Sequence, residues 1–218
     1  MTASPSRVIG LFPTPVLHAE RLVPPGLVEE LRAHFVQRAR QANAKSPQLA
    51  HTEILQPQAD ERLRALSALV GPRIAELGEL LFGERLEWSV KEIWANVLEA
   101  GGQQALHNHA NSFISGVVYL TPCHPQANLV FVKALGQPAF VFRNTHRASA
   151  TGPFNADKWI MPSVSAGDLV LFPSYLLHEV PTNPGEPRVS LAFNAIPDRL
   201  NASGYRIGFS TFPSGNNE

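Results

Sequence analysis

The sequence predicts an α+β fold, with a helical first part followed by a strand-rich second part. Apolar residues recur at helical spacing up to about residue 82, and from residue 86 they follow the shorter period typical of strands. The 19 prolines and 15 glycines, more frequent after residue 100, favour turns between short strands. Short antiparallel strands at this spacing indicate a sandwich or barrel, with the helices packed against one sheet.

The first elements are a predicted edge strand and a predicted helix. Residues 11–17 read as a short edge strand, a position in which proline is tolerated. Residues 25–43 read as a helix, because Leu27, Leu31 and Phe35 recur four residues apart and Pro24 and Pro25 can begin a helix.

A second helix is predicted over residues 60–82. Its apolar positions form one stripe, and Gly83 follows as the residue that ends the helix in a left-handed conformation. Pro72 lies within it and is expected to kink or split it.

The strand-rich part begins at residue 86. The predicted strands are residues 88–98, 114–120, 129–132, 139–142, 159–164, 168–172 and 188–196. We expect one domain over residues 1–218, in which residues 1–85 support a β-core formed by residues 86–200.

Composition excludes several classes of partner. The formal net charge is zero and no long basic run occurs, so we expect no nucleic-acid partner. No apolar run approaches the length of a membrane span, so we expect no membrane partner. Cys123 is the single cysteine, which is compatible with a reducing cytoplasm, the expected location. Nothing in the sequence indicates an oligomeric state.

Three histidines form the candidate functional site. His107 and His109 are two residues apart, so on a strand their side chains would share a face. His178 follows Pro173 in a loop that we expect at the mouth of a barrel, where it could complete a three-point metal site. The alternative is three structural histidines bonded to backbone carbonyls.

The ligand set favours an open, catalytic metal site. Imidazole suits iron, zinc, copper and nickel, whereas a structural zinc site would require a fourth protein ligand. Cys123 follows the end of a strand and is not well placed to be that ligand. Arg188, ten residues after His178, could hold an anion beside the metal.

These residues resemble the iron(II)- and 2-oxoglutarate-dependent oxygenases, which are built on the double-stranded β-helix, a jelly-roll or cupin-like barrel. The family pattern of His-x-Asp/Glu, a distant His, then Arg and Ser maps onto His107-x-His109, His178, Arg188 and Ser190. A closer likeness is to a family of 2-oxoglutarate–iron(II) oxygenases that share three further segments with this chain. These are a Leu-Phe-Pro-Thr-Pro-Val opening (residues 11–16), Ser-Gly-x-x-Tyr (residues 115–119) and Gly-Asp-x-x-x-Phe-Pro-x-x-x-x-His (residues 167–178).

The resemblance implies Fe(II) bound by His107, His109 and His178, with 2-oxoglutarate as cosubstrate. It implies that Arg188 and Ser190 bind the distal carboxylate of 2-oxoglutarate. Asn96 is a candidate for binding the proximal carboxylate or the substrate. The alternatives are a surface ion pair of Arg188 with Glu186 or Asp198, and a structural sheet-edge role for Asn96. Tyr119 and Trp159 could line the pocket, but each is also a typical core aromatic.

His109 departs from the wider family pattern, in which Asp or Glu is expected. With three neutral imidazoles the metal would keep its full charge, so zinc or nickel could compete better with iron. An alternative register would place Asn111 in the acidic position, but an amide is a poorer ligand than imidazole.

Two functions follow. The first is a 2-oxoglutarate-dependent dioxygenase that hydroxylates a polar small molecule or side chain; the polar segment at residues 136–158 is expected to cover its pocket. The second is a cupin-like metal protein that does not use 2-oxoglutarate, such as an isomerase, another dioxygenase or a ligand binder. Gly101, Gly167, Pro173 and Asn183 fit parts of the cupin pattern, but the glutamate expected after His109 is absent. Arg188 distinguishes the two, because only the first needs it.

Overall fold

The computed structural model describes residues 7–39, 41–43, 46, 48–134, 144 and 146–210. Its two α-helices are α1 (Pro25–Val36) and α2 (Glu61–Phe82). The strands are β1 (Leu17–Ala19), β2 (Gln41–Ala42), β3 (Leu49–His51), β4 (Trp88–Leu98), β5 (Gln104–His107), β6 (Ile114–Tyr119), β7 (Val130–Val132), β8 (Lys158–Ile160), β9 (Leu169–Pro173), β10 (His178–Val180), β11 (Arg188–Pro197), β12 (Arg199–Ala202) and β13 (Tyr205–Gly208).

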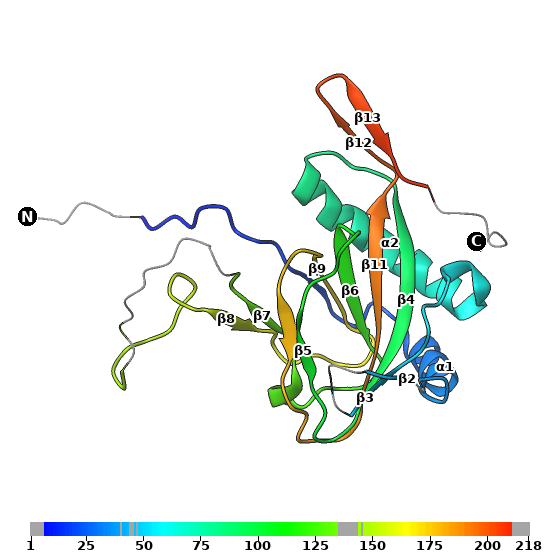
Figure 1. Ribbon diagram of the computed structural model, residues 1–218, viewed down its shortest axis with the longest axis horizontal. Coiled ribbons are helices and arrows are strands. Elements are labelled where there is room, and N and C mark those ends of the chain that lie inside the picture. Colours follow the sequence, from blue (N-terminus) through cyan, green and yellow to red (C-terminus); the bar gives the residue numbers. More distant parts are fainter. Residues whose placement is uncertain are drawn as a thin grey trace, which may run out of the picture.

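The strands form two antiparallel sheets and a separate hairpin. The larger sheet has the order β1-β9-β6-β11-β4-β3-β2, and the smaller has the order β5-β10-β7-β8. The hairpin of β12 and β13 projects from one end of the molecule (Figure 1). Both helices lie on one face of the larger sheet, so the expected α+β order with helices covering one sheet is confirmed (Figure 1).

Side-chain alternation along β11 separates two apolar cores. Val189, Leu191 and Phe193 point toward the helices and join a core that includes the buried stripe of α2. Side chains on the opposite face of β11 point toward the smaller sheet. A second apolar core between the two sheets includes Tyr119 and Phe172. The polar residues of β11, which have no place in the first core, therefore line the space between the sheets.

Helix α2 matches its prediction closely. The side chain of Asp60 accepts a hydrogen bond from the backbone N–H of Arg62 at 2.8 Å, and Gly83 ends the helix with φ 69°. The expected split at Pro72 is wrong, because α2 continues through it. Pro72 lies on the exposed face, where water can bond the carbonyl group that loses its helical partner.

Several predicted boundaries are wrong for physical reasons. The first strand spans Leu17–Ala19 and not residues 11–17, because Pro13 and Pro15 cannot donate to a ladder. Helix α1 ends at Val36, since its apolar pattern ends at Phe35 and the chain soon enters β2. Strand β8 spans Lys158–Ile160, so it begins one residue earlier and ends four residues earlier than the strand predicted at 159–164. The strand predicted at 139–142 lies outside the described residues, as do residues 136–143 and 145 of the segment at 136–158 that is expected to cover the pocket.

Neither helix of the described part of the chain combines the length and apolarity that a membrane crossing requires.

The Gly167–Asp168 pair fixes the first strand to the sheet. Asp168 accepts hydrogen bonds from the backbone N–H groups of Arg21 at 2.8 Å and Ser165 at 2.9 Å, and contacts His18 at 3.0 Å. Burial raises the pKa of Asp168, but these hydrogen bonds outweigh it and hold that pKa below its usual value. Gly167 has φ 92°, and a Cβ atom there would lie 2.6 Å from the carbonyl oxygen of Val23.

Gly167→Ala should therefore lower the free energy of unfolding by about 2–4 kcal/mol, from left-handed backbone strain plus the clash. Gly204→Ala is the matched control, because Gly204 also has a positive φ of 84° but open space around the added Cβ. The control should lose only about 1–2 kcal/mol, the backbone part. Urea unfolding of both variants measures the difference, and equal losses would show that the contact with Val23 is unimportant.

Candidate metal centre

The structure brings His107, His109 and His178 together between the two sheets. One ligand atom from each lies within 4.8 Å of the others. His107 ends β5 and His178 begins β10, where the two are paired directly across the strands. The ring of His178 also packs edge-on against Phe172 of the larger sheet, with centroids 4.7 Å apart. The trio therefore sits where the two sheets face each other.

Two local expectations about the trio are wrong. His109 is not on a strand, because β5 ends at His107, so period-two alternation does not place it. Its backbone N–H instead donates to the carbonyl oxygen of Ser174 at 3.0 Å, and its ring lies 5.7 Å from that of Trp94. His178 begins a strand and is not part of a loop. Pro173 ends β9, and four residues then reverse the chain into β10.

Backbone carbonyls orient two of the three rings. Nδ1 of His107 lies 2.7 Å from the carbonyl oxygen of Ala105, and Nδ1 of His178 lies 2.8 Å from that of Leu176. Since a carbonyl oxygen can only accept, each Nδ1 carries the proton and each Nε2 keeps its lone pair. This is the arrangement in which the second nitrogen of a ligating histidine is fixed by a hydrogen bond.

Burial keeps the three imidazoles neutral. It is the main cause that lowers the pKa of His178 to about 3 and that of His109 to about 4, and the neighbouring His107 lowers both further. Burial also lowers the pKa of His107. Neutral rings are the form that binds a metal, so the site is ready for one at neutral pH.

These pKa values predict an acid-sensitive metal-free protein. Because the folded values lie below the ordinary 6.5, the unfolded chain binds protons between about pH 6.5 and pH 4 that the folded protein does not. The free energy of unfolding should thus decrease as the pH is lowered through this window. His178 should contribute about 1–2 kcal/mol of this decrease between about pH 7 and pH 5. Denaturant unfolding at both pH values should show a smaller loss for His178→Gln than for the unmodified protein. An equal loss in both proteins would contradict it.

No fourth ligand of the same kind joins the trio from the part of the chain that the structure describes. Within the described residues, the three histidines are the one group of His, Cys, Asp and Glu side chains that gathers closely enough to hold a metal ion. Cys123 is not part of that group, as expected. A metal there would keep positions open for other ligands.

A buried guanidinium lies in the same space. Arg188 is 5% exposed, its Nε lies 3.1 Å from Sγ of Cys123, and its Nη1 donates to Oγ of Ser190 at 3.3 Å. The alternative, an ion pair of Arg188 with Glu186 or Asp198, is not found among the described residues, and Asp198 instead pairs with Arg199. Among the described residues, no carboxylate lies within ion-pair distance of Arg188. A buried cation in this state is costly unless an anion joins it.

Tyr119 supplies a second unsatisfied group beside Arg188. The guanidinium lies over its ring, 5.1 Å from the centroid. Its hydroxyl is fully buried and has no hydrogen-bond partner within the described residues, and burial raises the pKa of Tyr119 to about 12. A protonated phenol and a guanidinium both donate hydrogen bonds, so together they form a suitable binding site for a carboxylate.

Strand register orders the inner face of the larger sheet into rows. One row holds Tyr119, Ser190 and Asn96, side by side on β6, β11 and β4. A second row, one step along the strands, holds Val117, Ala192 and Trp94. A third holds Ser115, Asn194 and Glu92. Trp94 and Phe172 contact the histidines, so the metal site lies near the second and third rows, away from Arg188.

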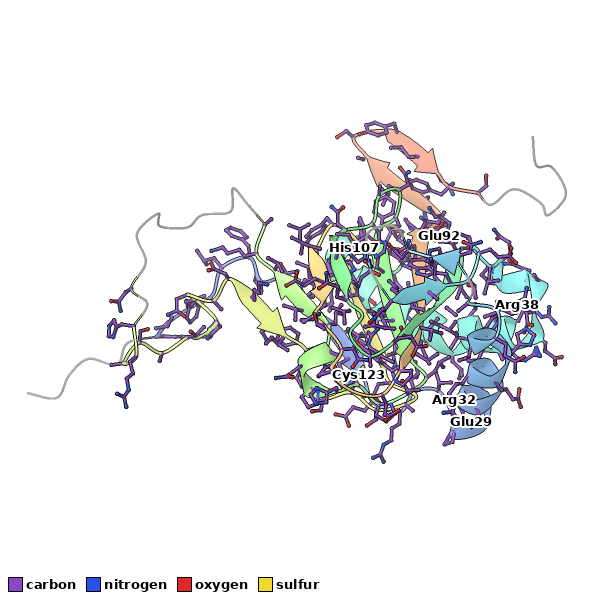
Figure 2. All side chains as sticks on the ribbon, turned by 60° about the horizontal axis from the view of Figure 1, so that its bottom comes forward. Glu29, Arg32, Arg38, Glu92, His107 and Cys123 are labelled. Atoms are coloured by element: carbon purple, nitrogen blue, oxygen red, sulfur yellow. The ribbon has the colours of Figure 1, made fainter. Side chains whose placement is uncertain are left out.

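Figure 2 agrees with this layout, because Glu92 and His107 lie toward one side of the strand-rich part and Cys123 toward the other. Asn96 is half-buried in the first row, beside Ser190, so its place permits the expected role without deciding it. Trp159 is 49% exposed and stacks on Phe131, so it is not a buried core residue.

Sequence reasoning missed several neighbours of the site. Cys123 was considered only as a metal ligand, whereas it contacts Arg188. Glu92 and Asn194 were not singled out for the site, although they form its third row. Alternation from Asn96 back to Glu92 along β4 was a signal for one of them. No local signal pointed to Cys123, which lies in the turn after β6.

The strand-rich half of the chain matches one protein family. Residues 92–194 match the family model described as "Putative 2OG-Fe(II) oxygenase", and the three histidines, Arg188 and Ser190 all lie within the match. The match takes in slightly less than half of the chain, and this part of the chain is similar to that family. A search of curated proteins gave no significant match to the chain.

Solved structures share the fold of this chain at low sequence identity. HygX from Streptomyces hygroscopicus, with nickel and 2-oxoglutarate bound, is 16% identical with a TM-score of 0.61, over 84% of this chain and 83% of that chain. SnoN, a non-heme α-ketoglutarate-dependent epimerase from nogalamycin biosynthesis, is 16% identical with a TM-score of 0.62, over 88% and 83%. SnoK, a carbocyclase from the same biosynthesis, is 16% identical with a TM-score of 0.61, over 85% and 81%. These likenesses confirm the expected double-stranded β-helix.

Proposed function

We propose that the protein is an Fe(II)- and 2-oxoglutarate-dependent oxygenase that oxidises a polar small molecule. The observation that carries the proposal is the pairing of two features between the sheets. Three neutral imidazoles converge there, and the buried guanidinium of Arg188, which has no carboxylate partner among the described residues, lies over Tyr119 in the first row. The similarity of residues 92–194 to the 2OG-Fe(II) oxygenase family gives these features a common purpose.

His107, His109 and His178 would hold the iron. Their lowered pKa values and the fixed Nδ1 protons of His107 and His178 suit metal binding, and imidazole is a good ligand for Fe(II). The bound iron would supply the redox chemistry with dioxygen, and 2-oxoglutarate the matching two electrons by its decarboxylation to succinate. The chain's own residues bind, orient and enclose the reactants.

Arg188, Ser190 and Tyr119 would bind the distal carboxylate of 2-oxoglutarate. Arg188 can offer two parallel N–H donors to a carboxylate, and the free Tyr119 hydroxyl can add a third. Asn96 lies in the same row as Ser190, where it can donate to the cosubstrate or the substrate. A carboxylate placed there also neutralises the buried charge of Arg188.

The reaction on the substrate is proposed as hydroxylation. SnoN and SnoK, an epimerase and a carbocyclase, show that this fold also serves other reactions. HygX has been crystallised with hygromycin B and SnoN with nogalamycin RO, both small molecules. By analogy we propose a small-molecule substrate and neither a nucleic-acid nor a membrane partner.

The domain and the cellular location are also proposals. The helices of residues 1–85 bury the outer face of the larger sheet, which supports a single domain whose core is residues 86–200. The free thiol of Cys123 contacts Arg188, an arrangement that a reducing cytoplasm would preserve.

The competing cupin-like function leaves Arg188 unexplained. Asn183, part of the cupin pattern, has a structural role, because its buried amide donates to the carbonyl oxygen of Glu186 at 2.9 Å and of Leu98 at 3.2 Å. A test is succinate formation from 2-oxoglutarate by the purified protein with Fe(II) and dioxygen. We expect slow succinate release even without the second substrate, dependent on both iron and dioxygen. If the protein neither turns over nor binds 2-oxoglutarate, the cupin-like function is favoured.

A further inference from the structure

His109 needs support that β5 does not give. It lies two residues beyond the end of the strand, on the segment that leads into β6, and Asn111 in that segment has a left-handed φ of 56°. The hydrogen bond from its backbone N–H to Ser174 holds one side of this segment. A metal ligand on a turn keeps its geometry only if other contacts fix the turn.

A chain of polar contacts runs from Ser174 across the third row of the sheet. Oγ of Ser174 lies 2.9 Å from Oγ of Ser115, which donates to Oδ1 of Asn194 at 2.7 Å. Nδ2 of Asn194 donates to Oε1 of Glu92 at 2.7 Å. Ser174, Ser115 and Asn194 are all buried, so these contacts are shielded from water.

The chain of contacts returns to the turn that carries His109. Nζ of Lys91 lies 3.4 Å from Oε1 of Glu92 and donates to the carbonyl oxygen of Asn111 at 3.2 Å. The contacts therefore form a closed network of polar contacts. It runs through Ser174, Ser115, Asn194, Glu92, Lys91 and the backbone of residues 109–111, and we call it the His109 network.

Glu92 also supplies charge. Three neutral imidazoles leave a divalent ion uncompensated, and a carboxylate near them stabilises it through space. Glu92 precedes Trp94 by two residues on β4, so both side chains lie on the same face of the sheet, and the Trp94 ring lies 5.7 Å from that of His109. Asn194 fixes the Glu92 carboxylate on the face of the sheet that carries Trp94.

We propose that Glu92 and Asn194 are positioning residues for the metal centre. The His109 network holds His109, the third ligand, in place, and Glu92 provides the negative charge that the three histidines lack. This inference rests on the proposed metal site. It accounts for a histidine in place of the carboxylate ligand, because strand β4 of the larger sheet supplies the negative charge instead.

Two variants separate charge from positioning. Glu92→Gln keeps an oxygen that can accept the hydrogen bond from Asn194 but removes the negative charge. Asn194→Ala breaks the His109 network and keeps the charge of Glu92. Glu99→Gln is the matched control, since Glu99 is exposed just past the other end of β4. Calorimetric titration of the metal-free proteins with Co²⁺ gives the affinities, and the absorption spectrum of bound Co²⁺ reports its coordination.

We expect Co²⁺ to bind about tenfold more weakly to Glu92→Gln and about 10–100-fold more weakly to Asn194→Ala, with an altered Co²⁺ spectrum for the second. The control should bind like the unmodified protein. A purely structural role would lower the stability of the metal-free variants and leave the Co²⁺ affinity unchanged, and this result would overturn the inference. If Asn194→Ala does not fold, Glu92→Gln decides alone, with unchanged affinity as the overturning result.

The same titration distinguishes the two levels of the argument. No Co²⁺ binding by the unmodified protein would reject the metal site and this inference together. Tight binding by the unmodified protein with equal affinity in all variants would reject the inference only.

Discussion

His178→Ala should abolish metal retention by the purified protein and leave its fold in place. His178 is 4% exposed and lies opposite His107, with ring centroids 4.2 Å apart. Removing it leaves two imidazoles, one of them on a turn, which is too few to hold a divalent ion against water. The two apolar cores do not depend on this side chain, so the loss of stability should be limited to about 2–3 kcal/mol for the small cavity.

Elemental analysis after dialysis against Fe²⁺ or Ni²⁺ measures retention, and circular dichroism checks the fold. His124→Ala is the matched control, because His124 is exposed and outside the trio. It should retain about one ion per chain, like the unmodified protein. Retention of a stoichiometric metal by His178→Ala would place the ion elsewhere and refute the proposed ligand set.

Arg188→Met should weaken 2-oxoglutarate binding by about two orders of magnitude, or about 2.7 kcal/mol, with metal binding unchanged. The reason is the loss of a two-pronged hydrogen bond to a carboxylate in a space shielded from water. Methionine fills much of the space, so the lost affinity reports the missing charge and donors. Anaerobic calorimetry of the metal-bound proteins with 2-oxoglutarate measures the effect.

Stability separates a binding role from a structural one. The buried Arg188 has no carboxylate partner within the described part of the chain, so its replacement should not destabilise the metal-free protein and could raise its free energy of unfolding by about 1 kcal/mol. Arg188→Lys is the conservative control and should recover part of the affinity, because it keeps the charge but loses the two-pronged geometry. A destabilised Arg188→Met with normal 2-oxoglutarate affinity would make Arg188 a structural residue.

The elements with strong local signals could be predicted from sequence. Helix α2 has a full apolar stripe, a capping Asp60 and a terminal Gly83, and β4 has its predicted bounds. Short strands such as β2, β3 and β10 could not be predicted, because two or three residues carry no periodicity and their pairing depends on distant partners.

The candidate site was predictable in its residues more than in its geometry. The motif spacing selected His107, His109 and His178, but the argument from alternation placed His109 on a strand that ends before it. The contacts that hold it come from Ser174 and, through Glu92 and Lys91, from β4, and only tertiary structure brings these together. The Tyr119 hydroxyl likewise acquires meaning only beside Arg188, which lies 69 positions later in the sequence.

The central claim is that the three histidines hold a metal next to a 2-oxoglutarate site formed by Arg188. A crystal structure of the protein with Fe²⁺ and 2-oxoglutarate, grown without oxygen and measured at the iron absorption edge, tests it most directly. We expect one anomalous peak at about 2.0–2.2 Å from a nitrogen of each histidine, with the far carboxylate of 2-oxoglutarate against Arg188 and the Tyr119 hydroxyl. An anomalous peak away from the trio, or 2-oxoglutarate bound without contact to Arg188, would contradict the account.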